Sequence, residues 1–514
     1  MRAAAAPSVA WALVLALALA LPTSTGAQQP SATPQQLHSL VQRIFEAWAP
    51  PGLAVAVVRN DSLLWARGYG VREVGRPKTV DEHTLFAVGS TSKAFTTTAL
   101  AMLVEEERLR WDDPAALHLP GFQLFDPAVT RYLTVRDLVT HRVGLARGDR
   151  LWYGTEYARE EILHRVRFLE PSWSFRHTFG YQNVAYLAAG EIVPRHTGIS
   201  WDDFVAERIF APLGMTRSTT SVRRLAGRDN VAQPHVWRDD EFQVIPYRNI
   251  DNIAPAGSIN SSAEEMSRWL RLHLNRGVFQ GQRLLSETSV EEMHTPWMIL
   301  PTHGGLATSY EVGHFLFYGL GWFLQDFRGR RVVQHGGGID GMTTFLAIVP
   351  EEGLGVVAIT NGGGLPVYGV VWDLLDALLG VPYRGVAEKF VQQTREQLAR
   401  AQEQQREVEA SRVPGTRPSL ALSAYAGEYR DAMYGTVRVE ESEGRLILSW
   451  AGLRGPLEHW HHDTFRLIWE DPVFGPTFAV FRLNAAGAVG AVSVEDLTRF
   501  LRVPAGTQGQ GGPP

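Results

Sequence analysis

Strand-like runs occur at two distant places in this chain, and a helix-rich segment separates them. The first, LAVAVVRNDSLLWARGYGVRE, holds two β-type stretches around Asn60-Asp61, and turn residues in that position predict a hairpin. Strand-like sequence returns at RRVVQHGGGIDGMTTFLAIVPEEGLGVVAITNG. This order predicts one large α/β domain, also describable as α+β, whose sheet takes strands from both ends of the segment and carries an inserted helical subdomain between them.

The composition changes after this domain, which we expect to span residues 28–385. Residues 386–417 contain AEKFVQQTREQLARAQEQQREVE, a helix-forming and increasingly polar run that predicts an exposed connecting helix. Residues 418–504 contain several short alternating stretches with Gly and Asp turns, which predict a small antiparallel β-barrel. The Gly-rich tail, residues 505–514, is predicted to be disordered.

Length and charge limit the function classes. At 514 residues the chain is long enough for two or three domains, and 45% apolar residues can form large cores. The formal net charge of -5 is nearly balanced, so nothing indicates a nucleic-acid surface. The chain has no cysteine, which excludes disulfides, a thiol nucleophile and thiolate metal sites.

The N-terminus has the pattern of an export signal. Arg2 precedes an apolar run from Val9 to Leu21, and the small residues Thr25-Gly26-Ala27 fit a signal-peptidase site. We therefore expect residues 1–27 to be a signal peptide and the protein to be periplasmic or secreted. The alternative is an uncleaved N-terminal anchor.

The stretch VGSTSK places Ser90 and Lys93 three residues apart at the start of a predicted helix. This spacing puts both side chains on one helix face, about one turn apart. The pair is either a weak nucleophile with its activating base, or an N-cap serine with a surface lysine. The helix continues as AFTTTALAMLVEEERL and is apolar nearly all round at its start, so we expect it to be buried.

Two further motifs carry reactive groups. Tyr181 and Asn183 stand two residues apart in a loop that leads into a predicted helix, and His335 precedes three glycines at the end of a predicted strand. Taken singly, each has a structural interpretation, because tyrosines before helices usually pack against a core and glycines after strands usually form turns. Their order along the chain, after the Ser90 motif, is what gives them significance.

VGSTSK, YQN and HGG in this order resemble the motifs of the serine β-lactamase and penicillin-binding superfamily. Within it, the chain is most similar to the group of class C β-lactamases, D-alanyl-D-alanine carboxypeptidases, D-aminopeptidases and family VIII esterases. The flanking stretches LTVRDLVTHRVGL and AGSINSSAEEMSRWL also resemble that group, and the resemblance covers roughly residues 38–380. The C-terminal module resembles the lipocalin-like barrels appended to some of these hydrolases.

The resemblance implies an acyl-enzyme mechanism. Ser90 would be the nucleophile and Lys93 its base, which requires that burial beside a cation lower the pKa of Lys93. Tyr181 would return a proton to the leaving group, and Asn183 would hold the substrate amide. The backbone N–H groups of Ser90 and Gly338 would bind the oxyanion. The resemblance implies no metal and no organic cofactor.

The third motif departs from the Lys-Thr-Gly that is frequent in the superfamily. His335-Gly336-Gly337 stands in its place, and the resemblance makes His335 and Gly337 candidate substrate-binding residues. Lysine is charged at neutral pH and histidine is not, so we expect capture of a substrate carboxylate to be weaker and pH-dependent. This departure argues against efficient β-lactam hydrolysis. Gln182 also replaces the small residue usual in the second motif.

Three C-terminal histidines, His459, His461 and His462, raise the alternative of a zinc site. Alternation along a strand would place these side chains on both faces, and no acidic or cysteine cluster accompanies them. We therefore expect structural or surface roles for them.

The sequence predicts an exported serine hydrolase that acts on an ester or amide, with a D-residue peptide as first choice and a short-chain ester as second. The alternatives are a β-lactam hydrolase and a ligand-binding or penicillin-sensing protein without turnover. The expected partner is a small-molecule or short peptide substrate. We expect no nucleic acid, and no membrane contact beyond an uncleaved N-terminal anchor; the oligomeric state is not predicted.

Overall fold

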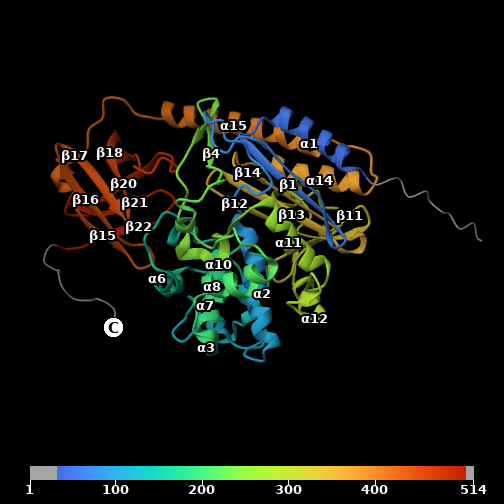
Figure 1. The fold of residues 1–514 in the computed structure, drawn as a ribbon. Helices are drawn as coiled ribbons and strands as arrows, with labels where there is room; N and C mark the ends of the chain where they lie inside the picture. The colour runs from blue at the N-terminus through green and yellow to red at the C-terminus, as the bar shows by residue number, and fades with distance from the viewer. Residues whose placement is uncertain (1–31, 505–514) are drawn as a thin grey trace, which may run out of the picture.

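A computed structural model describes residues 32–504 (Figure 1). The expected signal peptide, residues 1–27, and the expected tail, residues 505–514, lie outside the described residues. Among the described residues, no helix combines the length and the apolar character that crossing a membrane requires.

An eight-stranded antiparallel sheet forms the centre of the larger domain. Its N-terminal hairpin is joined to the later strands because Leu53 pairs with Thr360 along the β1–β14 ladder. The sheet thus takes strands from both ends of the segment, which confirms the predicted arrangement. The strand order is β2 (Ser62–Gly70), β1 (Gly52–Arg59), β14 (Leu354–Thr360), β13 (Met342–Val349), β12 (Arg330–Ile339), β11 (Phe323–Phe327), β10 (Leu316–Tyr318) and β9 (Met298–Leu300).

Helices cover both faces of this sheet, and β1 shows how one strand supplies two cores. Ala54, Ala56 and Val58 belong to the core on one face, whereas the alternating residues Leu53 and Val55 belong to the core on the other. The second face is covered by α1 (Pro34–Trp48), α14 (Pro366–Leu378) and the start of α15 (Val386–Ala410) (Figure 1).

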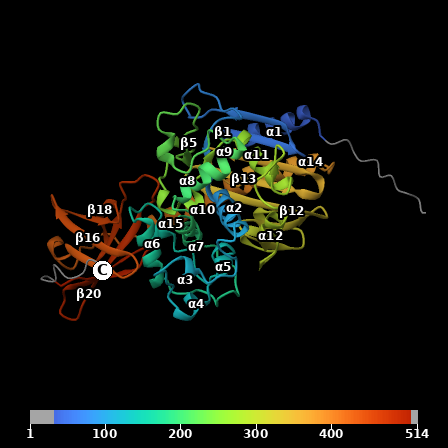
Figure 2. The same cartoon turned by 60° about the horizontal axis from the view of Figure 1, so that its bottom comes forward.

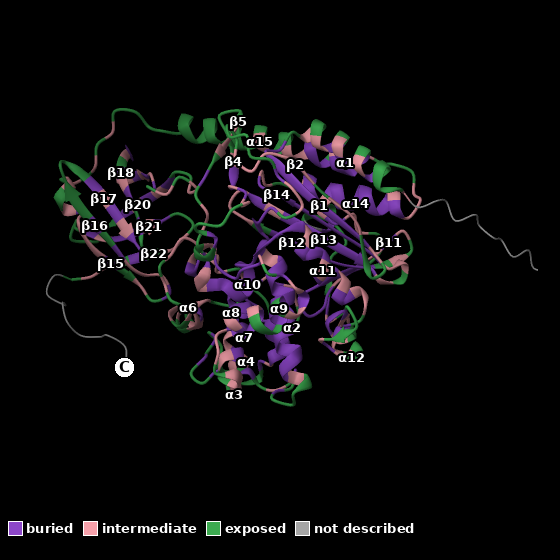
Figure 3. Ribbon diagram, viewed as in Figure 1, coloured by how far each residue is buried: buried purple, intermediate pink, exposed green. Residues whose placement is uncertain are grey.

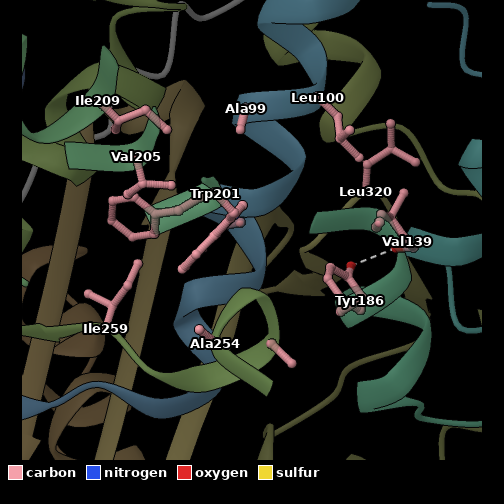
Figure 4. Packing of buried hydrophobic residues seen from close by; sticks show 14 of the residues in the cluster. Ala99, Leu100, Val139, Tyr186, Trp201, Val205, Ile209, Ala254, Ile259 and Leu320 are labelled. Carbon is pink, nitrogen blue, oxygen red and sulfur yellow. Dashed lines mark hydrogen bonds between the residues drawn. The ribbon is translucent and has the colours of Figure 1, made fainter. Parts of the chain in front are cut away.

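The first face carries α2 (Ser92–Glu105), which is enclosed by other parts of the domain on all sides. All of its residues from Ser92 to Leu103 are buried, as its all-round apolar sequence predicts (Figure 3). Figure 4 shows Ala99 and Leu100 of α2 within the core that Trp201 and Tyr186 complete, with the Tyr186 phenol donating to the Val139 carbonyl at 2.6 Å. This packing fixes the helix that follows the Ser90 motif.

The segment between β2 and β9 forms the inserted helical subdomain. Its helices besides α2 are α3 (Ala115–His118), α4 (Pro127–Tyr132), α5 (Val135–Val139), α6 (Arg159–Arg165), α7 (Asn183–Thr197), α8 (Trp201–Val205), α9 (Ala211–Leu213), α10 (Ala254–Gly257), α11 (Ala263–Leu274) and α12 (Glu287–Met293). Of these, α7, α8, α10 and α12 pack against α2. A further helix, α13 (Gly305–Ser309), lies between β9 and β10 and contributes Ala307 to the core on the second face of the sheet. Small two-stranded pairings join β3 (Phe86–Ala87) to β6 (Asn260–Ser261), β4 (His235–Arg238) to β5 (Glu241–Val244), and β7 (Val278–Phe279) to β8 (Gln282–Arg283).

A closed antiparallel barrel follows α15, in agreement with the predicted C-terminal fold. The first turns of α15 bury Val386, Ala387, Phe390 and Val391, so this end of the helix is anchored on the sheet side, and the later part is mostly exposed (Figure 3). The barrel strands are β15 (Gly427–Asp431), β16 (Gly435–Ser442), β17 (Arg445–Trp450), β18 (Leu453–His461), β19 (Thr464–Leu467), β20 (Thr477–Leu483), β21 (Val489–Val494) and β22 (Arg499–Arg502).

A buried carboxylate holds α15 against α14. Asp373 is 1% exposed and accepts hydrogen bonds from the backbone N–H groups of Val386 and Ala387 at 3.0 and 2.9 Å. Burial raises its pKa from 3.8 to about 6. Because the folded-state pKa is the higher one, the associated stabilisation is complete below the unfolded pKa and is lost as the pH rises through about 6.

The raised pKa of Asp373 leads to a prediction about the stability of Asp373→Asn. As the pH rises from about 4 to 8, the wild type should lose about 3 kcal/mol of its free energy of unfolding relative to the variant. The reason is that only the wild type must ionise a buried carboxyl. Urea unfolding at several pH values measures it, with Asp229→Asn, on a side chain that is 89% exposed, as the control. A difference that stays constant with pH would contradict the prediction.

Candidate active site

Ser90 and Lys93 lie where a 3-10 turn, η1 (Gly89–Thr91), passes into α2. The Lys93 Nζ is 3.1 Å from the Ser90 Oγ, 2.8 Å from the Asn183 Oδ1 and 2.8 Å from the Ala256 carbonyl. A neutral amine has two hydrogens for the last two oxygens, which leaves its lone pair for the serine hydroxyl proton. The arrangement therefore suits a serine activated by an amine base.

The environment of Lys93 favours that neutral form. The side chain is fully buried, and this burial is the main reason that its pKa lies well below the ordinary value of 10.5. The positive charge of Arg147 lowers the pKa further, while the carboxylate of Asp149 acts in the opposite direction. Lys93 is thus both buried and close to a cation, the two conditions expected from the sequence for a lysine that acts as a base.

Tyr181 contacts both the serine hydroxyl and Lys93. Its ring lies 4.7 Å from the Lys93 Nζ, and burial raises its pKa above the usual value, although a hydrogen bond with Ser90 and the charge of Arg147 oppose this rise. The phenol is therefore neutral at physiological pH. A neutral phenol beside the nucleophile can donate a proton to a leaving group.

Asn183 is the first residue of α7, and Gln182 is the N-cap that fixes it there. The Gln182 side chain accepts from the Val184 N–H at 3.0 Å and donates to the Ala146 carbonyl at 2.6 Å. The Asn183 Oδ1 accepts from Lys93, and its Nδ2 donates to the Asp149 Oδ1 at 2.9 Å. These bonds fix the orientation of the amide, and the second Nδ2 hydrogen is left for a substrate.

The end of β12 lies directly against the serine turn. A Cβ added to Gly337 would lie 2.0 Å from the Val88 carbonyl oxygen and 3.0 Å from the Ser90 nitrogen, and one added to Gly89 would lie 2.6 Å from the Gly338 nitrogen. Gly89 also has a φ of 55°, which favours glycine. The expected pair of oxyanion donors, the N–H groups of Ser90 and Gly338, is therefore brought together by contacts that only glycine permits.

The structure corrects the expectation that His335 captures a carboxylate in a pH-dependent way. The residue is 1% exposed, its Nδ1 is 2.6 Å from the Gly336 carbonyl, and its Nε2 is 3.2 Å from the Tyr318 phenol. Burial, with the nearby Lys93, lowers its pKa to about 3. The ring is therefore neutral at physiological pH and both nitrogens already have protein partners. Sequence could not show this, because burial is a tertiary property.

Sequence reasoning missed three residues that act on this centre. Arg147 lies over the Tyr181 ring, with its Cζ 5.2 Å from the ring centroid, and pairs with Asp149. Asp149 also accepts from the Trp152 indole at 2.9 Å. The His141 ring packs against the Tyr181 ring in a tilted arrangement, with the ring centroids 4.3 Å apart, and accepts from the Gln182 N–H. The stretch GLARGDR gave no spacing signal that linked it to either motif.

The C-terminal histidines lie away from this centre, at the junction of the barrel with the end of α15. The His459 Nε2 lies 3.0 Å from the His462 carbonyl, and the Val413 N–H donates to the His461 Nδ1 at 3.3 Å. Among the described residues, no group of three or more His, Asp or Glu side chains is arranged to hold a metal ion.

The position of Arg147 generates a prediction about pH. Because its charge lowers the pKa of Lys93, Arg147→Gln should raise that pKa and move the acidic limb of kcat/KM to higher pH, by up to about one unit. A pH–rate profile measures it. Arg195→Gln, which removes an exposed charge from the far end of α7, is the control and should leave the limb unmoved. Identical profiles for wild type and Arg147→Gln would contradict the electrostatic role.

Comparison with known protein families agrees with this geometry. Residues 40–381 match the family model described as Beta-lactamase, and residues 411–507 match a domain of unknown function (DUF3471). The penicillin-binding protein 4 of Amycolatopsis lactamdurans is 32% identical over 342 residues, covering 64% of this chain and 85% of that protein. The unguisins hydrolase ungD' of Aspergillus campestris is 28% identical over 436 residues, covering 80% and 79%.

Solved structures share the fold. The octameric penicillin-binding protein homologue from Pyrococcus abyssi aligns over 91% of this chain and 99% of its own, with a TM-score of 0.60 and 21% identity. A D-stereospecific amidohydrolase from Streptomyces sp. aligns over 66% of this chain and 98% of its own, with a TM-score of 0.54 and 23% identity. With the Beta-lactamase match extending over most of the chain, this protein belongs to the β-lactamase family, within the superfamily that includes the penicillin-binding proteins.

Proposed function

We propose that this chain is a serine hydrolase that forms an acyl-enzyme on Ser90 and acts on amide bonds next to D-residues. The observation that carries the proposal is the buried Lys93 amine, 3.1 Å from the Ser90 Oγ and held by two further acceptors. An amine kept neutral by burial is a base at physiological pH, which an exposed lysine is not.

The proposed reaction uses each group in a definite role. Lys93 takes the Ser90 hydroxyl proton as the Oγ attacks the carbonyl carbon, and the backbone N–H groups of Ser90 and Gly338 bind the resulting oxyanion. The proton passes to the leaving amine or alkoxide through Tyr181, the bond to the leaving group breaks, and the acyl-enzyme remains. Water, deprotonated by the same groups, then releases the acid and restores Ser90.

The substrate class is inferred from the site together with the relatives. One structural neighbour is named as a D-stereospecific amidohydrolase, and one relative as a penicillin-binding protein. The neutral His335 replaces the lysine that is frequent in the third motif, which argues against strong capture of the carboxylate of a β-lactam. A short-chain ester is the second candidate, because an ester needs less help with the leaving group than an amide.

Ser90→Ala tests the mechanism. Turnover of D-residue peptide amides and of a p-nitrophenyl ester should fall on the order of 10⁴-fold or more, because the nucleophile is lost. The free energy of unfolding should change by no more than about 0.5 kcal/mol. A fluorescent penicillin should label the wild type on the peptide that carries Ser90, as mass spectrometry can locate, and should not label the variant.

Other results would redirect the assignment. Full activity in a folded Ser90→Ala protein would contradict the acyl-enzyme mechanism. Equal rates on D- and L-residue amides would reject the D-specificity, and turnover of esters alone would favour the second candidate. Permanent labelling without turnover would indicate a penicillin sensor, and rapid hydrolysis of the penicillin would indicate a β-lactamase.

We also propose that the chain is exported. The basic Arg2, the apolar run to Leu21 and the small residues before Gln28 support this proposal. The expected result is a protein, expressed with its full N-terminus and recovered from the periplasm or medium, whose first residue by N-terminal sequencing is Gln28. An intact N-terminus on a membrane-bound product would instead indicate an uncleaved anchor.

A further inference from the structure

The barrel lies against the larger domain beside α6 (Figure 2). Near α6, the Tyr157 phenol donates to the Tyr434 carbonyl at 2.7 Å and Arg165 donates to the Met433 carbonyl at 3.0 Å. A second region of contact involves the barrel loop between β19 and β20, where Arg238 donates to the Pro472 carbonyl at 2.8 Å. This second contact continues into a buried ionic cluster.

Arg248 is the centre of that cluster, and its guanidinium binds two carboxylates from different domains. Its Nε donates to the Asp340 Oδ2 at 2.7 Å, and its two terminal nitrogens donate to the Asp471 oxygens at 2.5 and 3.2 Å. The side chains are 10%, 7% and 22% exposed for Arg248, Asp340 and Asp471. A bidentate pair at this depth has a defined geometry, unlike the flexible ion pairs of a protein surface.

Asp340 connects this cluster to the proposed oxyanion site. It lies in the tight turn between β12 and β13, two residues after Gly338. The Tyr153 phenol also donates to Asp340, and Tyr153 follows the turn whose Asp149 holds Asn183. One carboxylate thus joins the segment that supplies an oxyanion donor to the segment that orients the amide beside Lys93.

The barrel contributes an aromatic contact as well as a charge. The Phe474 ring lies 5.4 Å from the Tyr153 ring in a T-shaped arrangement, and the Arg248 guanidinium lies 5.2 Å from the Phe474 ring centroid and 5.0 Å from that of Tyr153. The absence of a side chain at Gly154 leaves room for the Phe474 ring, since an added Cβ there would lie 2.6 Å from it. The barrel loop therefore fits a surface shaped to receive it.

Attachment of the barrel alone does not account for this cluster. The contacts near α6 end on backbone carbonyls of the barrel, and the carboxylate that pairs with Arg165 there, Glu161, belongs to the same domain as Arg165. A buried arginine between two carboxylates adds desolvation cost and directional constraint, which simple attachment does not need. The constraint acts on the turn that follows Gly338.

We propose that Arg248 is a positioning residue through which Asp471 of the barrel fixes the Asp340 turn, and with it the Gly338 N–H that binds the oxyanion. The catalytic site is then complete only when the barrel is docked. This inference rests on the proposed acyl-enzyme function. Asp471 and Arg248 touch neither the substrate nor Ser90 and act through the backbone of the turn.

Asp471→Asn is the variant that tests this, because it keeps the side-chain shape and removes the charge. With a p-nitrophenyl ester, kcat should fall roughly 10- to 100-fold while KM changes less than about twofold, because an oxyanion donor acts in the transition state. The acidic limb of the pH profile should stay in place, because the surroundings of Lys93 are unchanged.

Two variants serve as controls. Glu428→Gln breaks an exposed barrel ion pair with Arg438, of 2.9 Å, and should leave kcat unchanged. Tyr157→Phe removes a contact between the domains away from the cluster and should also leave kcat unchanged. A loss of kcat in Tyr157→Phe equal to that in Asp471→Asn would overturn the proposal, since any loosening of the barrel would then suffice. An effect of Asp471→Asn on KM alone would also overturn it.

A readout independent of activity separates this inference from the proposed function. Hydrogen exchange, followed by mass spectrometry on the intact chain, should be faster at Gly338–Met342 in Asp471→Asn than in the wild type or in Glu428→Gln. Unchanged exchange there would overturn the positioning role even if the enzyme were active. Faster exchange in a protein that turns over no ester or amide would support the positioning role and would count against the proposed function alone.

Discussion

The burial of the Lys93 amine is the interaction on which the remainder of the structure depends. An amine without water needs hydrogen-bond partners from the protein: Asn183 and Ala256 supply two acceptors and Ser90 supplies the hydroxyl, and the three lie on separate segments. Keeping water away in turn requires α2 to be enclosed on every side. The inserted helical subdomain can be understood as that enclosure, and the short helices α7 and α10 carry the two acceptors to their places.

Contact between backbones is the second requirement, because two N–H groups from different segments must point at one oxygen atom. Strand β12 approaches the serine turn so closely that Gly337 and Gly89 have no room for a side chain. The strand is held in the middle of the sheet, and the turn is held by α2. The proposed oxyanion site therefore depends on how closely the sheet packs against the helical subdomain.

Sequence revealed those parts of the site that are local. Ser90 and Lys93 share a helix turn, Tyr181 and Asn183 share a helix start, and the glycines of β12 follow one another, so each set forms a short motif, and the order of the three motifs gives the resemblance that implies their roles. Partners from distant segments left no such trace, as with Asp149 and Arg248. Glu265 is a further example: Ser262 caps α11 by accepting from the Glu265 N–H, while the Glu265 carboxylate accepts from the Arg217 N–H and the Ser218 hydroxyl of a distant segment.

Gly338 differs from its neighbours in one respect that affects how such an enzyme can change. It is exposed, and an added Cβ would meet nothing nearer than the Met342 carbonyl oxygen at 3.9 Å, whereas Gly337 and Gly89 admit no side chain at all. Selection for a new substrate therefore has an accessible position within the strand that lines the nucleophile. A side chain introduced there would occupy space beside the nucleophile while the backbone hydrogen-bond donor stayed in place.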